Sequence, residues 1–451
     1  MSQLGHPPEP DSANTLPSLG RNSAARLIAD LFALASGLIT GVLTARFLGP
    51  GGKGQYSLLT FVTAIVAQAC SVGLSDAAII SVGQKKASFQ RALSGTVALS
   101  LVMGLVSMPV LWLSFVVIFQ ADWADTRWAA LIATIGLLPA LWTNMSAWFL
   151  NGLERFVAGS AVIAVTQFLT GMGLVVLVAF LGQGLTGGLL ATALGAVLAA
   201  ALGGVLVSRA GLRLRPTWDT EYFRIAAPNG LSVGASHLLT VGLVRADLVF
   251  VYLLAGSASA GHYSVALAVG LLALMPPIAM SVGTFPRLAN LPQQQADQLI
   301  AKVFRFSILA VFVTSFGLAV ATPIFVPFAF GKAFRPAVLP SLIVLAGGVP
   351  WTAQWILSRA QAARGRTSMH LKVVGLSLAV MCLLDLFAVR RFGILGAAGA
   401  SSIAPVVGSA YCLWVYRRAE WWPHPMALLL PSTADVRALS TNFFRLIRSR
   451  A

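Results

Sequence analysis

Long apolar stretches, bounded by charged residues, Pro/Gly clusters or aromatic residues, recur along the whole chain. A transmembrane helix needs about 20 predominantly apolar residues, so this pattern predicts an all-α polytopic membrane protein with twelve spans. The predicted spans are 24–45, 55–80, 92–119, 128–150, 157–180, 185–207, 228–252, 262–285, 303–328, 337–358, 371–389 and 394–416. Only a short Gly-rich break around 182–188 separates the fifth span from the sixth.

Comparison of the chain with itself indicates an internal repeat. At an offset of 207 residues, four positions are identical, namely Gly49, Gly54, Tyr56 and Ser57 with Gly256, Gly261, Tyr263 and Ser264. A weaker echo at an offset of 211 pairs Gly182 and Gly188 with Gly393 and Gly399. Because the offset covers six spans, an even number, the halves share one topology, which predicts two parallel six-helix repeats. Two such bundles enclose a cavity that opens alternately to either side, as in a transporter.

Composition agrees with a membrane protein and explains the net charge. Of the 451 residues, 57% are hydrophobic and 10% are charged, whereas a soluble domain averages about 25% charged residues. The net charge of +17 is unevenly placed. The loops on one side, with the adjoining helix ends, hold 23 Lys and Arg residues, and the other side holds 7. The positive-inside rule makes the first side cytoplasmic, with both termini there. The basic excess therefore indicates orientation and lipid contact, and not nucleic-acid binding.

The same pattern divides the chain into five parts. We expect a disordered cytoplasmic N-terminus at 1–23, a six-helix bundle at 24–207, a cytoplasmic linker at 208–227 and a second bundle at 228–418. Residues 419–451 form a tail, in which 432–450 has the spacing of an amphipathic helix with interspersed arginines. Such a helix binds anionic lipids at the membrane surface. A solvated, frayed tail is the alternative.

Motifs for enzymatic chemistry are missing from the sequence. The GPGGKG segment at 49–54 resembles a P-loop superficially, but Lys53 is followed by Gly and not by Ser or Thr, so we interpret it as a turn between helices. No HExxH, CxxC or GxSxG motif occurs, and Cys70, Cys382 and Cys412 all lie in apolar runs. We therefore expect a protein that is not an enzyme, without cofactor or metal, which transports its substrate without hydrolysing ATP.

Five charged residues lie inside the predicted spans, where each costs at least about 2.5 kcal/mol and usually marks a transport pathway. They are Asp30, Asp76, Arg245, Asp247 and Asp385. Asp385 lies near the outer end of the eleventh span, and the sequence assigns it no partner. Mid-span prolines at 276–277, 350 and 405 permit bends in three further places.

The seventh span carries a polar stripe. At 100° per residue, its members fall within about 80° of one another on the helix. They are Asn229, Ser232, Ser236, Thr240 and Asp247. Arg245 points about 160° away from Asp247, so we expect Asp247 to face the cavity and Arg245 to face a neighbouring helix. In the alternative interpretation, the hydroxyls bond back to carbonyls of their own helix and face another helix.

The first two spans carry further candidate site residues. One face of the first span holds Arg26, Asp30, Gly37, Gly41 and Thr44. Gly37 and Gly41 form a GxxxG motif, which is typical of close helix packing, and Arg26 and Asp30 have the spacing of a local ion pair near the cytoplasmic mouth. One face of the second span holds Ser57, Thr60, Gln68, Ser71 and Ser75, with Asp76 to its side.

Six segments, in order between residues 25 and 418, resemble the polysaccharide transport family, which contains the Wzx-type flippases of the MOP exporter superfamily. They are RFLGPGGKGQYSLL, NGLERF, RADLVFVYLLAGSASAGHYSVAL, FPRLANL, FGKAFRPAVLP and RRFGILGAAGASS. The resemblance implies a MATE-like fold in a bacterial inner membrane. It also implies an undecaprenyl-pyrophosphate-linked glycan as substrate, flipped by an ion gradient, with H⁺ or Na⁺ as the coupling ion.

In this family an acidic residue often occupies the position of Asp247. A pyrophosphate calls for cationic lining, which Arg26 and Arg46 at opposite ends of the first span would supply. A polysaccharide polymerase or a glycosyltransferase is the implied protein partner. Two other functions stay open, a MATE-like antiporter of small cationic molecules and a membrane scaffold for a glycan-assembly complex.

Overall fold

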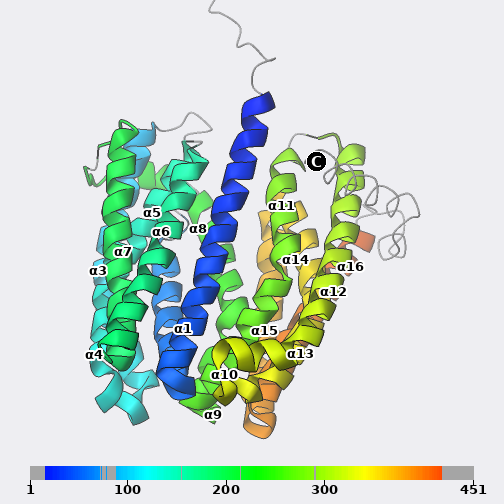
Figure 1. Ribbon diagram of the computed structural model, residues 1–451. Helices are drawn as coiled ribbons and strands as arrows, with labels where there is room; N and C mark the ends of the chain where they lie inside the picture. The colour runs from blue at the N-terminus through cyan, green and yellow to red at the C-terminus, as the bar shows by residue number, and fades with distance from the viewer. Residues whose placement is uncertain are drawn as a thin grey trace, which may run out of the picture.

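A computed structural model describes residues 16–71, 73, 78, 88–153, 155–213, 215–288 and 291–418, with side chains from residue 35 onward except at 225, 229, 282, 283, 286, 287 and 367. Every regular element in these ranges is helical, and the helices stand side by side in two groups (Figure 1). The expected all-α class is confirmed.

The first bundle begins with α1 (Leu16–Ser71), which bends at Gly49 into two arms. The rest of this bundle consists of α3 (Phe89–Ile118), a 3₁₀ turn (Gln120–Asp122), α4 (Trp123–Ile135), α5 (Leu137–Gly152), α6 (Phe156–Leu174), a π turn (Val175–Phe180) and α7 (Gly184–Arg209). The second bundle consists of α8 (Thr220–Arg245), α9 (Asp247–Ala255), α10 (Ser257–Ala273), α11 (Met275–Leu288), α12 (Gln293–Phe330), a 3₁₀ turn (Lys332–Ala337), α13 (Val338–Ala346), α14 (Gly348–Ala363), α15 (Thr367–Phe392) and α16 (Ile394–Arg418).

The number of membrane spans is roughly consistent with the predicted twelve. Seven helices of the described chain are long and apolar enough to cross a membrane, and three bent pairs raise the number to ten. The two arms of α1, which the sequence predicts to be the first two spans, are not among these ten. Two of the bent pairs break just before Pro276–Pro277 and Pro350, as expected, whereas α16 continues unbroken through Pro405.

The outer surface of the bundles is apolar, as a bilayer requires. Large hydrophobic side chains project outward from the middle of the spans, among them Val106 on α3, which is 63% exposed, and Phe316 on α12, which is 66% exposed. Exposed apolar surface of this extent is unfavourable in water and is typical of contact with lipid. The chain is therefore a multi-pass membrane protein.

The turn glycines confirm the internal repeat. Gly49 has φ 67° and ψ −177°, and Gly256 has φ 87° and ψ 172°. Gly182 and Gly393 also share a positive φ, 63° and 58°. These left-handed conformations favour glycine because a side chain would clash with the backbone. The repeat thus preserves backbone geometry at both pairs of turns.

The two equivalent turns pack against each other. A side chain at Gly54 would overlap the carbonyl oxygen of Ser257, and a side chain at Gly261 would overlap that of Pro50. The contact is reciprocal, because Ser257 and Gly261 lie 207 residues after Pro50 and Gly54. The two six-helix repeats are therefore joined here by a pseudo-twofold contact.

Three helices begin well before the hydropathy pattern predicts. α1 starts at Leu16, inside the N-terminus that the sequence predicts to be disordered. α8 starts at Thr220, inside the expected linker, where the Asp219 carboxylate accepts a hydrogen bond from the backbone N–H of Tyr222. α12 starts at Gln293 and not near 303. Hydropathy marks only the lipid-embedded part of a helix, while capping and hydrogen bonding extend the helix into the polar surroundings.

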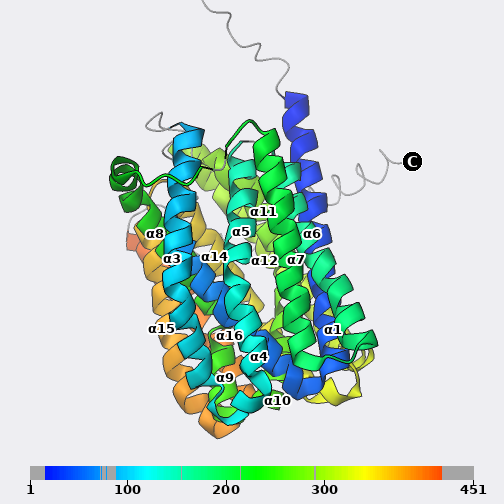
Figure 2. The same cartoon turned by 90° about the vertical axis from the view of Figure 1, so that its left-hand side faces the viewer.

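The bundles touch at both ends of the molecule. At the end that carries α9 and α10 (the outer end, by the predicted orientation), Tyr252 donates a hydrogen bond to Asp122 across 2.6 Å. At the opposite, inner end, the start of α3 lies beside α8 (Figure 2), and Arg91 pairs with Asp219 at 2.5 Å. Gly73 also packs closely against the α8 backbone at Gly230 and Gly234.

Candidate functional site

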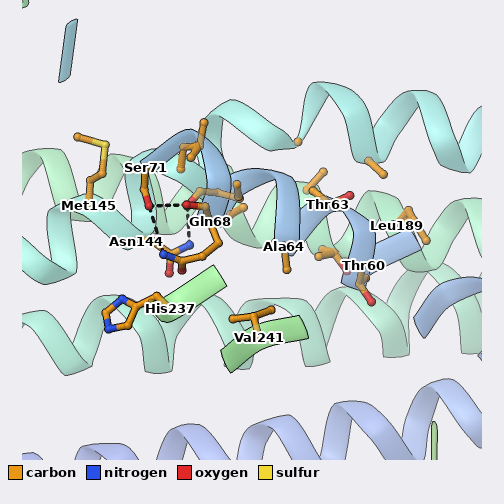
Figure 3. Close-up of a pocket in the computed structure, with 18 of the residues that line it drawn as sticks. Thr60, Thr63, Ala64, Gln68, Ser71, Asn144, Met145, Leu189, His237 and Val241 are labelled. Atoms are coloured by element: carbon orange, nitrogen blue, oxygen red, sulfur yellow. Dashed lines mark hydrogen bonds between the residues drawn. The ribbon is translucent and has the colours of Figure 1, made fainter. Parts of the chain in front are cut away.

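A cavity of about 330 Å³ lies between the first bundle and α8. Its walls come from the second arm of α1, from α4, α5 and α7, and from α8, the first helix of the second bundle. Gln68, Ser71 and Asn144 lie on one side of the cavity and face His237 and Val241 on α8 (Figure 3). The remaining polar side chains of the lining are Thr60, Thr63 and Thr192. The expected polar face of the second span thus lines this cavity at Thr60, Gln68 and Ser71.

The lining of this cavity is largely apolar, and its polar side chains are neutral hydroxyls and amides together with His237. The Gln68 amide donates to the Ser71 hydroxyl at 3.3 Å, and the Asn144 amide donates to the Ala140 carbonyl at 2.9 Å. The side-chain carbonyl oxygens of Gln68 and Asn144 remain as acceptors. No Asp, Glu, Lys or Arg is among the described residues that line the cavity. Neutral donors and acceptors beside Trp148 suit a hydroxyl-rich ligand better than an ion.

The hydroxyls of the α8 stripe bond within their own helix. Ser236 donates to the carbonyl of Ser232 at 2.9 Å, and Thr240 donates to that of Ser236 at 2.7 Å. Both side chains line other, smaller cavities on the second-bundle side of α8. These hydroxyls therefore bond as in the alternative interpretation of the stripe, back to carbonyls of their own helix.

Asp247 faces neighbouring helices, contrary to the expectation that it faces the cavity. It is fully buried, and its carboxylate accepts hydrogen bonds from Tyr263 on α10 and Ser401 on α16, both at 2.5 Å. Arg245 is the exposed member of the two. The helix breaks between these residues at Ala246, with a bend of 40° between α8 and α9. A helical wheel that assumes an unbroken helix at 100° per residue therefore assigns Asp247 to the wrong face.

A second carboxylate lies near Asp247. Asp385 on α15 is fully buried, and neither of its oxygens has a hydrogen-bond partner in the part of the chain that the structure describes. The two carboxylates are close enough to interact electrostatically. Two buried negative charges are unfavourable in a low dielectric unless a proton or cation compensates them. The sequence marked both residues, but only the fold brings them together.

Lys53 is a buried cation that sequence reasoning missed. It is 8% exposed, and its ammonium donates to the Thr44 hydroxyl at 2.8 Å across the bend of α1. It interacts electrostatically with Arg245 of the other bundle. The sequence placed Lys53 in an outer turn, where a lysine is normally solvated. The bend at Gly49 instead folds the turn into the contact between the bundles.

Arg46 binds the end of another helix. Its guanidinium donates to the carbonyls of Phe328 and Ala329 at 2.5 and 2.7 Å, in the last turn of α12. A cation at this position satisfies terminal carbonyls and the helix dipole. This arrangement ties α1 to the second bundle and leaves Arg46 less suited to bind a substrate from the rim.

The remaining candidates are only partly described. Arg26 and Asp30 lie on the first arm of α1 and Asn229 lies on α8, but their side chains are outside the described residues, as is the whole of Asp76. The GxxxG prediction of close packing is not met within the described residues, because none of their atoms lies within 4 Å of where a side chain at Gly37 or Gly41 would begin.

Comparison with known proteins shows the family and the fold. The model of a family described as polysaccharide biosynthesis protein matches residues 19–292. A search of curated proteins finds no match. The lipid II flippase MurJ in an inward closed conformation is similar in structure, with a TM-score of 0.73 and 15% identity over 87% of both chains.

Two transporters of the MOP superfamily also share the fold. An inward-facing multidrug resistance MATE family transporter has a TM-score of 0.66 and 12% identity, over 89% of this chain and 100% of that one. A MOP superfamily transporter from Pyrococcus furiosus has a TM-score of 0.63 and 14% identity, over 89% of this chain and 95% of that one. The MATE-like fold expected from the sequence is confirmed.

Proposed function

Since this chain belongs to the polysaccharide biosynthesis protein family and has the fold of MOP superfamily transporters, we propose that it is a flippase for a polyprenyl-pyrophosphate-linked oligosaccharide. It works by alternating access in a bacterial inner membrane, with both termini in the cytoplasm. The observation that carries the proposal is the cavity between the first bundle and α8, in which neutral hydroxyls and amides are set among apolar side chains.

The lining of this cavity suits the sugar part of such a substrate. Threonine hydroxyls, the amides of Gln68 and Asn144, and the Trp148 ring offer hydrogen bonds and apolar contact without a fixed charge. A carrier of organic cations gains less support, because Asp247 and Asp385 lie outside this lining. We therefore favour the glycan over a small cationic molecule.

The two buried carboxylates are the proposed coupling site. Binding of H⁺ or Na⁺ between Asp247 and Asp385 compensates their charge, and loss of the ion favours a different arrangement of α9, α15 and α16. Asp247 directly follows the break between α8 and α9, and α8 forms one wall of the glycan cavity. Movement at this break links ion binding to the cavity.

Alternating access requires that the contacts at the two ends break in turn. The outer contact consists of the Gly54 and Gly261 turns with the Asp122–Tyr252 hydrogen bond, and the inner contact consists of Arg91 with Asp219 and of Gly73 with α8. Opening the inner contact admits the substrate, and opening the outer contact releases it.

Reconstitution into vesicles tests this function. A fluorescent polyprenyl-pyrophosphate glycan is supplied on one side, and its appearance on the other is followed with and without a proton or sodium gradient. We expect gradient-dependent transfer by the wild-type chain, and reduced transfer by Gln68→Ala and Asn144→Ala. The proposal would be refuted if vesicles with the wild-type chain transferred no more of the fluorescent glycan than protein-free vesicles.

A further inference from the structure

The first arm of α1 packs against the second bundle at the outer end of the molecule. Ala45 on this arm is 1% exposed and shares a buried apolar cluster with Val326 and Phe330 of α12. The second arm of α1, beyond the bend at Gly49, instead lines the cavity between the bundles. Figure 1 shows α1 standing between the two groups of helices. The outer half of the first arm therefore forms a lateral seam with α12, the α1–α12 seam.

Arg46 closes the α1–α12 seam at its lipid-facing surface. Its guanidinium donates to the carbonyls of Phe328 and Ala329 at 2.5 and 2.7 Å. Both carbonyls lie in the last turn of α12, where no later residue of the helix donates to them. Phe328 is 77% exposed and Phe47, next to Arg46, is 48% exposed, so this contact lies where the seam meets lipid. In the part of the chain that the structure describes, no other hydrogen bond joins residues 35–48 of α1 to α12.

The rest of the α1–α12 seam is apolar, and apolar surfaces separate easily in a bilayer. In water their separation would lose hydrophobic stabilisation, but lipid tails are as apolar as leucine and replace the partner side chains. Separation of α1 from α12 therefore costs little apart from packing, whereas the carbonyls of α12 lose a charged hydrogen-bond donor. Arg46 is the group that holds this seam shut.

The repeat creates a second seam, which is held differently. α9 and α3 occupy the places of α1 and α12 there, and the position 207 residues after Arg46 is Leu253, an apolar residue that is 55% exposed. Next to it, Tyr252 is 7% exposed and donates to the Asp122 carboxylate at 2.6 Å. The Tyr252 ring also packs edge-on against Phe119 at 5.0 Å. The α3–α9 seam is therefore held by buried contacts, while the α1–α12 seam depends on one exposed side chain.

We propose that the α1–α12 seam is the lateral passage through which the lipid chain of the substrate leaves for the outer leaflet, and that Arg46 is its latch. This proposal rests on the proposed function and deepens it. The lipid chain stays in the hydrocarbon while the glycan crosses, because its transfer to water is unfavourable. The glycan cavity must therefore open sideways as well as outward. When Arg46 releases the two carbonyls, α1 moves away from α12, and water at the outer interface binds the freed groups.

Distances across the two seams test the latch. Spin labels at Phe47→Cys and Phe328→Cys report the α1–α12 seam, and labels at Val117→Cys and Leu253→Cys report the α3–α9 seam, all at exposed positions. The full chain, with its 3 native cysteines replaced by alanine, is measured in lipid nanodiscs. We expect Arg46→Gln to raise the ratio of open to closed α1–α12 seam about tenfold or more, as the loss of hydrogen bonds from a charged group implies. The α3–α9 distance should stay unchanged.

Two further variants control this measurement. Arg46→Lys keeps the charge but loses the planar fork, so we expect an intermediate rise. Arg335→Gln removes an exposed arginine from the turn that follows α12 and should leave both distances unchanged. Thermal unfolding verifies that each variant is folded. An unchanged α1–α12 distance in Arg46→Gln would overturn the latch.

A covalent bridge across the seam tests the passage. Arg46→Cys and Ala329→Cys are joined by a short bifunctional thiol reagent, which a reductant splits again. We expect the bridge to reduce transfer of the fluorescent lipid-linked glycan to the level of protein-free vesicles, and the reductant to restore it. A long flexible bridge between the same cysteines lets the helices part and should permit transfer. Equal loss of transfer with the long bridge would overturn the passage.

Failure of this proposal and failure of the proposed function give different results. Transfer by the wild-type chain that the short bridge does not reduce refutes the passage and leaves the flippase intact. Opening of the α1–α12 seam in Arg46→Gln, with no transfer by the wild-type chain, refutes the flippase and leaves the latch intact.

Discussion

The two bundles have the same backbone fold, but they bury different side chains beside their equivalent turns. Tyr56 in the first bundle and Tyr263 in the second lie 207 residues apart, and the hydroxyl of each lies close to a hydroxyl on the last helix of its own bundle. Tyr56 lies 2.8 Å from the Thr192 hydroxyl, and Tyr263 lies 2.7 Å from that of Ser401. Only Tyr263 also donates to a carboxylate, that of Asp247.

The position equivalent to Asp247 in the first bundle is neutral. It is Thr40, 207 residues earlier, whose hydroxyl is buried without a hydrogen-bond partner in the described chain. The carboxylates at Asp247 and Asp385 are confined to the second bundle, while the first bundle lines the uncharged cavity. Under the proposed function, the second half of the duplicated fold holds the coupling ion and the first half lines the glycan cavity.

The largest expected effect comes from removing the charge that distinguishes the bundles. Asp247→Asn keeps an acceptor oxygen for Tyr263 and Ser401 but loses the negative charge, so the chain should fold while its transport loses gradient dependence. We expect gradient-driven transfer to fall about 5- to 150-fold, the range of typical coupling free energies. Thr40→Val, at the equivalent position, is the control and should transport normally. Full gradient dependence in Asp247→Asn would remove Asp247 from the coupling site.

The reciprocal contact of the two turns offers a test of their equivalence. Gly54→Ala and Gly261→Ala each force a methyl group into a backbone carbonyl, and overpacking of this kind costs about 1–3 kcal/mol. Because the contact is reciprocal, the two losses should be similar. Gly41→Ala, which has open space around it, should be neutral or gain up to about 1 kcal/mol from helix propensity. Unfolding in detergent measures all three, and equal damage from Gly41→Ala would contradict the packing argument.

The two tyrosines should differ in their contribution to stability. Tyr263→Phe removes a hydrogen bond to a carboxylate, worth about 1.5–3 kcal/mol, whereas Tyr56→Phe removes a neutral one, worth about 0.5–1.5 kcal/mol. We expect the free energy of unfolding to fall more for Tyr263→Phe. A larger loss for Tyr56→Phe would show that the carboxylate does not set the bundles apart.

The smallest effect concerns the inner contact between the bundles. Hydrogen bonds from Arg91 and from the Tyr222 backbone lower the pKa of Asp219 from 3.8 to about 2. Because the pKa of Asp219 is lower in the folded chain than in the unfolded one, this contact stabilises the fold at pH values above 3.8. The stabilisation is lost as the pH falls toward 2.

The melting temperature of the wild type should therefore fall between pH 4 and pH 2, and Asp219→Asn should flatten that part of the curve. Asp125→Asn, exposed on α4, controls for the loss of a carboxylate. If Asp219→Asn kept the wild-type fall in melting temperature between pH 4 and pH 2, this contact would not be the group that titrates.

Predictions from the sequence succeeded where the physics is local. Long apolar runs specify spans because every lipid-embedded backbone group must bond within its own helix. The left-handed turns at Gly49 and Gly256 were found by alignment of identical glycines, since few other residues adopt that conformation. The mid-span prolines likewise located two of the bends.

The site required the tertiary structure. The Asp247 carboxylate meets Ser401 and approaches Asp385 only through the packing of α9, α15 and α16, and the break at Ala246 leaves no signal in the apolar pattern. Lys53 is buried because its turn packs against the equivalent turn, 207 residues further along the chain.

Twelve spans, their repeat and the glycines of their turns were thus determined by the sequence itself. The faces that pack, line a cavity or meet lipid were decided only by the fold. Lipid tails are as apolar as leucine, so hydrophobicity does not distinguish a helix face that packs on protein from one that faces the bilayer. The open face at Gly37 and Gly41 and the close contact at Gly54 and Gly261 show this with the same residue type.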